Sequence, residues 1–268
     1  MDDRVSYAYA VLRGGGVPEG ALAALTGVAG APVGLVTAGP LAAAVSPVPA
    51  ADFREEALRR HLEDLDWLEA VARAHHTVIE ALSAHTTVLP LRLATVYLDD
   101  ARVLAVLRDD DAAFTQVLER LAGHLEWGVK IYVEAPAAAA SAGTAGAGAG
   151  EDLSPGRAYL RARRAQRHSR DEAYRAAEEA AARVETIGRE LATGHARHRV
   201  QQGQLAAGAG ENVLNDAFLL ADEQAEAFRT RVLAAGEGLP GVRVDVTGPW
   251  APYSFAALPG ADVADAPP

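Results

Sequence analysis

The stretch HLEWGVKIYVE, from His124 to Glu134, alternates apolar and polar side chains more cleanly than any other part of the chain. A period of two places Val129, Ile131 and Val133 on one face of an extended strand and polar residues on the other. Such a strand is half-buried in a sheet. We therefore expect one compact unit before this strand and a second unit built on it.

Length and composition agree with two domains. The chain has 268 residues, half of them apolar, which is enough for two ordinary hydrophobic cores. We place the domains at 1–122 and 123–268. The chain has no Cys, which excludes disulfides, thiolate metal sites and Cys nucleophiles. Its net charge of −11 is shared by both halves and argues against nucleic acid as the main partner.

The first domain is expected to mix strands and helices. Asp52, followed three residues later by Glu55, resembles a capping box, and the apolar stripe after it predicts one helix of about thirty residues. Two shorter helices each begin at an Asp. The predicted strands are Val5–Leu12, Ala31–Thr37, Leu41–Val45 and Val88–Tyr97, and the shorter helices are Asp99–Leu107 and Asp111–Leu121.

The second domain is predicted to alternate strands with helices, as in an α+β sandwich with a mostly antiparallel sheet. The sixteen residues from 135 to 150 are Ala, Pro, Ser, Gly and Thr only, which predicts a flexible loop. Gly188 and Gly194 make an unbroken helix across the next segment doubtful. After the first strand, the elements are a helix at 157–199, a strand at 211–220, a helix at 222–235 and a strand at 242–247. The aromatic segment Gly248–Phe255 is expected to lie over this sheet.

Three patterns resemble ligand sites but lack the context that such sites need. Gly14–Gly16 has no following Lys-Ser/Thr and opens no helix, so a turn is the better interpretation. His75 and His76, with His85 or His61, could be metal ligands, but neighbouring residues on a helix point about 100° apart. The run Asp109–Asp111 is better explained as a solvated turn with a helix cap. We expect no metal and no cofactor.

Two further features concern location and surface charge. The amino terminus lacks a signal-peptide pattern, and no window of about 18 apolar residues predicts a membrane span. Six Arg lie between residues 157 and 170. A nucleic-acid surface would need interleaved aromatics, and only Tyr159 is available. A solvated or protein-contacting helix face is therefore the better interpretation.

Seven short motifs, in order along residues 5 to 256, together resemble the gas vesicle protein F/L family (GvpF/GvpL). Two positions depart from the family pattern: Leu93 stands where an aromatic is common, and Ala251 where a further Pro is common. The motifs are Tyr7–Tyr9, Ala74–His76, Val88–Arg92, Glu126–Lys130, Gly156–Leu160, Val213–Leu219 and Gly248–Phe255.

This resemblance implies a cytoplasmic accessory protein of gas vesicle formation, located in the cytoplasm or on the vesicle. Family members are thought to bind the small hydrophobic shell protein, and each other, during nucleation or growth of the vesicle. The implied fold has two α+β domains, the second a ferredoxin-like sandwich with extra helices. The family has no catalytic residues to carry over, so we expect no enzyme.

Aromatic and Arg side chains dominate interface hot spots, which makes some residues of the second domain candidates for partner binding. Each aromatic could instead belong to the core. A ligand-binding or enzymatic module remains the alternative, although Ser83, His85, His168 and Ser169 form no recognisable catalytic pattern. Glu126 and Lys130 would face one side of the strand roughly 13 Å apart, too far for a direct ion pair. The candidate partner-binding residues are Trp127, Tyr159, Arg161, Arg164, Trp250, Tyr253 and Phe255.

Overall fold

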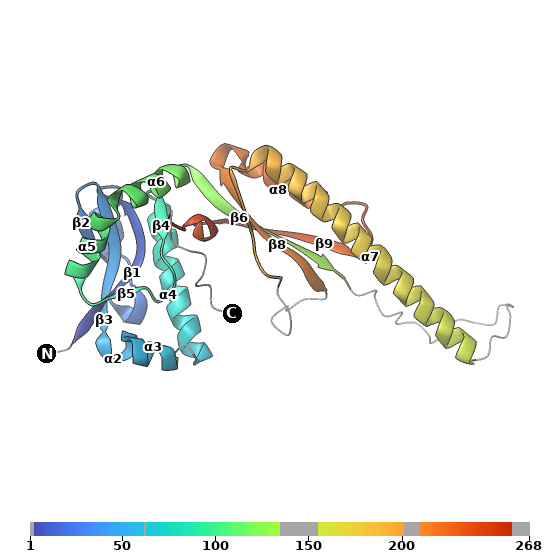
Figure 1. Ribbon diagram of the computed structural model, residues 1–268, viewed down its shortest axis with the longest axis horizontal. Coiled ribbons are helices and arrows are strands. Elements are labelled where there is room, and N and C mark those ends of the chain that lie inside the picture. The colour runs from blue at the N-terminus through green and yellow to red at the C-terminus, as the bar shows by residue number, and fades with distance from the viewer. Residues whose placement is uncertain (1–2, 62, 135–154, 201–209, 259–268) are drawn as a thin grey trace. The chain divides into compact units, whose positions relative to one another are not determined.

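The protein, in a computed structural model, forms two compact units (Figure 1). The structure describes residues 3–61, 63–134, 155–200 and 210–258. Residues 1–126 and 249–268 make the first unit, and residues 127–248 make the second. This division differs from the expected 1–122 and 123–268 chiefly at the end of the chain, because the segment from Pro249 belongs with the first unit.

An antiparallel sheet with β1 as its central strand forms the centre of the first unit. Side chains from Val5 to Leu12 are all buried, so both faces of β1 are covered. The predicted strand Val88–Tyr97 is interrupted by a turn in which the amide of Thr95 bonds to the carbonyl of Arg92. The order is β2-β3-β1-β4, and β5 also pairs with β1. The strands are β1 (Arg4–Arg13), β2 (Gly34–Ala38), β3 (Leu41–Pro49), β4 (Val88–Pro90) and β5 (Val96–Tyr97).

The single long helix expected from Asp52 is wrong, because three helices share that apolar stripe. Arg54 has an extended backbone and separates the first two. The N-cap of the long helix is Asp64, whose carboxylate accepts hydrogen bonds from the amides of Asp66 and Trp67. Asp99 caps α5 as predicted. The helices are α1 (Glu19–Ala23), α2 (Ala50–Phe53), α3 (Glu55–His61), α4 (Leu65–Ser83), α5 (Asp100–Asp109) and α6 (Asp111–Leu121).

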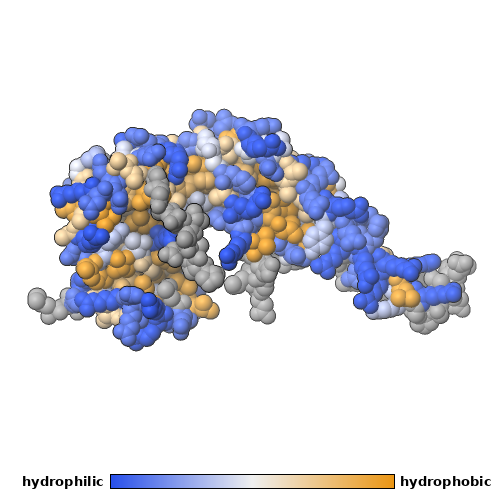
Figure 2. Space-filling model, in the orientation of Figure 1, coloured by the Kyte–Doolittle hydropathy of each residue, from blue (hydrophilic) through white to orange (hydrophobic). Residues whose placement is uncertain are grey.

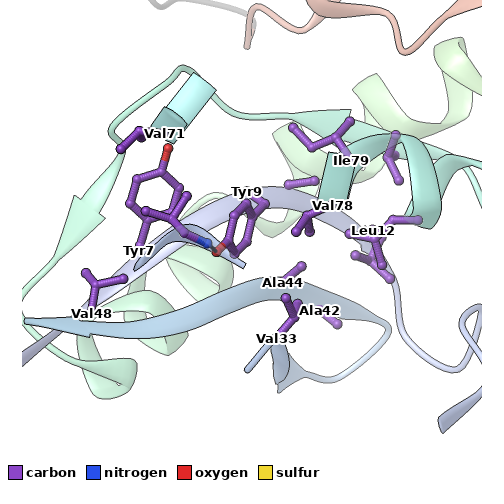
Figure 3. Close-up of a cluster of buried hydrophobic side chains, with 14 of the residues drawn as sticks. Tyr7, Tyr9, Leu12, Val33, Ala42, Ala44, Val48, Val71, Val78 and Ile79 are labelled. Carbon is purple, nitrogen blue, oxygen red and sulfur yellow. Dashed lines mark hydrogen bonds between the residues drawn. The ribbon is translucent and has the colours of Figure 1, made fainter. Parts of the chain in front are cut away.

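The core of the first unit lies between β1 and α4. Figure 3 shows Tyr7, Tyr9 and Leu12 of β1 in the same cluster as Val78 and Ile79 of α4. Burial of such large side chains supplies about 1.5–3 kcal/mol each before conformational entropy is subtracted. This core is the support on which the candidate site described below is built.

The second unit has the element order β-α-β-β-α-β, which is the ferredoxin-like arrangement. Its sheet order is β7-β8-β6-β9. The sequence prediction missed β7, whose residues pair with β8 from Gly194↔Leu219 to Arg197↔Asp216. The α+β class and the ferredoxin-like second unit are confirmed. The elements are β6 (His124–Val133), α7 (Pro155–Leu191), β7 (Gly194–Arg197), β8 (Glu211–Ala221), α8 (Ala225–Ala234) and β9 (Val242–Trp250).

Helix α7 continues through Gly188 but ends at Leu191, and a strand begins at Gly194. The doubt about one unbroken helix over 157–199 is therefore confirmed at Gly194 but not at Gly188. A Cβ at this position would lie 2.3 Å from Cε1 of Phe218. Glycine is therefore required where the helix meets β8, and close packing offsets its low helix propensity. The predicted loop at 135–150 lies outside the described residues. Of the helices that the structure describes, none is both long and apolar enough to cross a membrane.

Candidate interaction surfaces

Trp127 lies in the core of the second unit rather than on its surface. Only 8% of the residue is exposed, and it packs with Val129, Ile131 and other buried residues. Its indole Nε1 has no hydrogen-bond partner among the described residues. Trp127 therefore packs the core of the second unit and offers little surface to a partner.

Tyr253 lies in the first unit, not over the second sheet as the sequence analysis expected, whereas Trp250 is the last residue of β9 and groups with the first unit. Their ring partners are the two adjacent histidines of α4. The His76 ring centroid lies 5.6 Å from that of Trp250 and 6.3 Å from that of Tyr253, and the His75 ring lies 6.5 Å from that of Tyr253. Trp250 is 38% exposed and Tyr253 37% exposed. We call Trp250, Tyr253 and His76 the aromatic surface.

A buried carboxylate holds the segment that carries these rings. Glu126 accepts hydrogen bonds from the amide of Ser254 at 2.8 Å and from its hydroxyl at 2.7 Å. Arg120 donates to the backbone carbonyl of Phe255 at 2.6 Å, and Ala251 is buried in the first core. Phe255 itself is only partly exposed. The segment is thus fixed at several points, which orients the aromatic surface.

His75 is a buried residue of α4 whose two ring nitrogens both have hydrogen-bond partners. Its Nε2 lies 3.2 Å from the carbonyl of Leu91, which can only accept, so Nε2 carries the proton. Nδ1 then accepts from the hydroxyl of Tyr7 at 3.0 Å. Burial lowers the pKa of His75 from 6.5 to about 4, so the ring is neutral near pH 7. Burial likewise raises the pKa of the Tyr253 phenol.

The other histidines proposed as metal ligands do not gather around His75. His61 stacks on Trp67 with ring centroids 4.9 Å apart, and His76 faces Glu80 at 3.3 Å. Within the described part of the chain, no three His, Asp or Glu side chains are grouped as a metal ion would require.

The first part of α7 forms a second candidate surface, the basic arm, which we define as residues 157–170. Every side chain described in the arm is exposed, and the first buried residue of the helix is Ala173. Figure 1 shows α7 continuing beyond the sheet, and Figure 2 shows this part of the helix largely covered by hydrophilic residues. Tyr159 is 62% exposed and Leu160 57%. Arg161 and Arg164 are exposed as well.

One side of the arm borders a hollow of about 470 Å³ within the second unit. Arg170 forms an ion pair with Glu211 at 3.3 Å there, and Tyr174 donates to the same carboxylate at 2.5 Å. For Arg157, Arg161 and Arg164, the described residues provide no acidic partner. The hollow is lined by Val133, Glu134, Arg163, Gln166, Arg167, Arg170, Gly210 and Glu211.

The polar residues weighed for an enzymatic alternative remain scattered. Ser83 and His85 belong to the first unit, whereas His168 and Ser169 belong to the second. The Ser83 hydroxyl donates to the carbonyl of Glu80 at 2.9 Å, and His168 faces Glu172 at 3.2 Å. The contacts of Ser83 and His168 are thus local to their own helices, and neither joins a set of nucleophile, base and orienting group among the described residues.

Known proteins resemble this chain over nearly its whole length. The family model described as gas vesicle synthesis protein GvpL/GvpF matches residues 5–257. Gas vesicle protein L from Streptomyces sp. (strain CB03234) is 46% identical over 263 residues, covering 97% of this chain and 96% of that protein.

Two solved structures share the fold. The crystal structure of GvpF from Anabaena sp. PCC7120 has a TM-score of 0.61 at 20% identity, covering 96% of this chain and 97% of that one. The crystal structure of GvpF from Microcystis aeruginosa has a TM-score of 0.58 at 18% identity, covering 95% of this chain and 99% of that one.

Proposed function

The chain belongs to the gas vesicle synthesis protein GvpL/GvpF family, and we propose that it is an accessory protein of gas vesicle assembly. In this role it binds the small hydrophobic shell protein, and other accessory proteins, during nucleation or growth of the vesicle. It acts in the cytoplasm and at the vesicle, and it carries out no catalytic step. A shell subunit with exposed apolar surface would aggregate if unprotected, so a protein partner that covers such a surface would aid assembly.

The observation that carries this proposal is the aromatic surface. Trp250 and Tyr253 are more than a third exposed, although aromatic rings of this size gain most by burial. Aromatic anchors on a rigid support are typical of interface hot spots. Here the support is the buried carboxylate of Glu126, which holds the backbone of the segment, and the His75 ring, whose centroid lies 6.5 Å from that of Tyr253.

The test is a binding measurement with the major shell protein in purified form. The double variant Trp250→Ala, Tyr253→Ala is expected to lose binding by about tenfold or more, since hot-spot truncations cost about 2 kcal/mol or more. A matched control is Leu98→Ala, which removes an apolar side chain that is 73% exposed elsewhere on the same unit.

Two results would overturn the proposal. One is the absence of any binding between the unaltered chain and the shell protein. The other is equal binding by the double variant and the control, with both variants folded by circular dichroism. The second result would move the contact away from the aromatic surface while leaving the family membership untouched.

A further inference from the structure

Helix α7 carries two blocks of opposite charge along one face. Residues seven positions apart lie on nearly the same side of an α-helix, with a drift of about 20° per step. Arg157 and Arg164 begin one such series, and Asp171, Glu178 and Glu185 continue it. All five side chains are exposed. The four steps from Arg157 to Glu185 add up to about 80° of a straight helix surface, which a left-handed supercoil of two helices would take up. We call this series the charge stripe.

Among the described residues, the members of the charge stripe are available to a partner. Within the described ranges, no ion pair involves any of its five members, whereas other acids of α7 are already paired: Glu179 with Arg183 at 2.6 Å, and Glu190 with Arg231 at 2.5 Å. The hollow beside the arm is lined on α7 by Arg163, Gln166, Arg167 and Arg170, and by none of the five members of the charge stripe.

The opposite side of α7 is already occupied within its own unit. Ala173, Ala177, Ala180 and Val184 are buried in the second core. Positions on a helix repeat every 3.6 residues, which places these four away from the charge stripe. A partner could therefore lie on the stripe without disturbing the sheet.

We propose that two copies of the chain associate through α7, with the two helices antiparallel about a twofold axis beside Asp171. In this arrangement Arg164 lies opposite Glu178 of the second copy, and Arg157 lies opposite Glu185 of the second copy. The twofold axis repeats each pair, so that the interface is self-complementary and closed. The overlap covers about 29 residues, roughly 43 Å of helix.

Charge selects a second copy over other occupants of the arm. The chain is acidic overall, at −11, so that nucleic acid would be repelled by everything except the arm. The acidic residues that would face the arm, Glu178 and Glu185, lie on the same helix and are seven positions apart, as Arg157 and Arg164 are. An antiparallel second copy presents them in the matching order. Antiparallel helices also align their dipoles favourably. The two Asp171 side chains meet at the axis, and Arg175, exposed one turn away, offsets their repulsion.

The first test uses the purified full chain in sedimentation velocity runs. Exposed ion pairs are individually weak and are screened by salt. We therefore expect a dimer at about 50 mM NaCl whose dissociation constant rises at least tenfold at about 500 mM. A dissociation constant that does not change with salt would contradict the proposal, and so would a monomer at low salt.

Charge reversal gives a sharper test. Variant A, Arg157→Glu with Arg164→Glu, makes both halves of the stripe acidic. Variant B, Glu178→Arg with Glu185→Arg, makes both halves basic. Each alone is expected to be monomeric. An equimolar mixture of A and B is expected to form a heterodimer, because each arm then meets an opposite charge on the other copy. All four substitutions in one chain are expected to restore the homodimer.

The arrangement also predicts a specific cross-link. The chain has no Cys, so that Asp171→Cys introduces a single thiol, which the twofold axis places beside its copy. Mild oxidation or a short bis-maleimide is expected to join two chains. The control Glu226→Cys, exposed on α8, is expected to remain uncoupled.

Three outcomes would refute the antiparallel pairing. They are dimerisation of variant A and variant B separately, failure of their mixture to associate, and equal cross-linking of the two Cys variants. If the arm instead binds a different acidic protein, the unaltered chain stays monomeric alone and variant A loses that other partner. None of these outcomes bears on shell-protein binding by the aromatic surface.

Discussion

Glu126 and Ser254 are 128 residues apart in the sequence, yet the carboxylate of Glu126 accepts hydrogen bonds from both the amide and the hydroxyl of Ser254. Glu126 is only 9% exposed. A buried carboxylate is stable only where its oxygens are satisfied. This pair therefore fixes the segment around Ser254 within the first unit and positions Trp250 and Tyr253.

Replacing Glu126, the carboxylate that holds Ser254, is expected to destabilise the protein. Glu126→Gln removes the charge. The Gln carbonyl can still accept from the Ser254 amide and its NH₂ can donate to the Ser254 hydroxyl, so the variant loses the charge that strengthens both hydrogen bonds. We expect a loss of about 1–3 kcal/mol in the free energy of unfolding, measured by urea denaturation. The control Glu119→Gln alters an exposed carboxylate paired with Arg13 and is expected to cost less than about 0.5 kcal/mol. Equal losses of unfolding free energy in the two variants would contradict a stabilising role for the Glu126–Ser254 hydrogen bonds.

Gly188→Ala tests the contact between α7 and β8. The added methyl group would lie 2.3 Å from the ring of Phe218. That ring has neighbours of its own, because its centroid lies 4.7 Å from that of His195 and 5.2 Å from that of Phe228. We expect a loss of about 1–3 kcal/mol from overpacking, although Ala favours a helix over Gly by about 1 kcal/mol.

The control for this variant is Gly20→Ala. Gly20 lies in α1, and a Cβ there would meet nothing within 4 Å. This change is expected to be neutral or to stabilise the fold by up to about 1 kcal/mol. Thermal unfolding of both variants distinguishes packing from helix propensity, and a stabilised Gly188→Ala would show that Phe218 can move.

The buried His75 makes stability depend on pH. Its folded pKa of about 4 lies below the usual 6.5, so the unfolded chain binds more protons between these values. The stability it supports is therefore complete above about pH 6.5, falls as the pH drops toward 4, and is lost below that. The shift corresponds to roughly 3 kcal/mol over the whole window.

This pH dependence is measured by denaturation at several pH values. In His75→Gln the fall in stability between pH 6.5 and 4 is expected to be smaller by about that amount. The control His168→Gln changes an exposed histidine and is expected to leave the unaltered profile. The unaltered chain, His75→Gln and His168→Gln share the carboxylates that titrate in the same pH range. If all three showed the same dependence of unfolding free energy on pH, His75 would not be its source.

Tyr9→Phe tests the buried hydroxyl on the central strand. This hydroxyl donates to the Ser46 hydroxyl and accepts from the amide of Val28, both at 2.8 Å. Phe fits the same space but leaves the Val28 amide without its partner. We expect a loss of about 1–3 kcal/mol in urea denaturation. A loss below about 0.5 kcal/mol would mean that water replaces the hydroxyl.

Local patterns predicted the elements whose signal is contained in a few neighbouring residues. The alternation in β6 and the apolar run of β1 predicted strands, and Asp99 marked the start of α5. The ordered motifs predicted the family. The same logic misplaced the start of the long helix, because the apolar stripe continues across the break at Arg54 and only geometry distinguishes Asp64 from Asp52 as the cap.

The candidate site was predicted only in part. The sequence singled out Trp250 and Tyr253 but expected both rings to lie over the second sheet, and it could not separate exposed Tyr159 from buried Trp127. It considered His75 and His76 only as metal ligands. A signal was present in the two adjacent histidines on an apolar helix face, but their partners, Tyr7 and the carbonyl of Leu91, come from other elements.

The sequence by itself determined the α+β class, most of the strands and helices, and the family, because periodicity, caps and motifs act over a few residues. Only the tertiary structure decided which unit holds the last segment, why Gly188 sits within a helix, and where β7 pairs. Each of these depends on contacts between distant residues, as between Glu126 and Ser254 or between Gly188 and Phe218. Such contacts leave no local pattern, because the free energy that selects them comes from burial and hydrogen bonding in the folded chain.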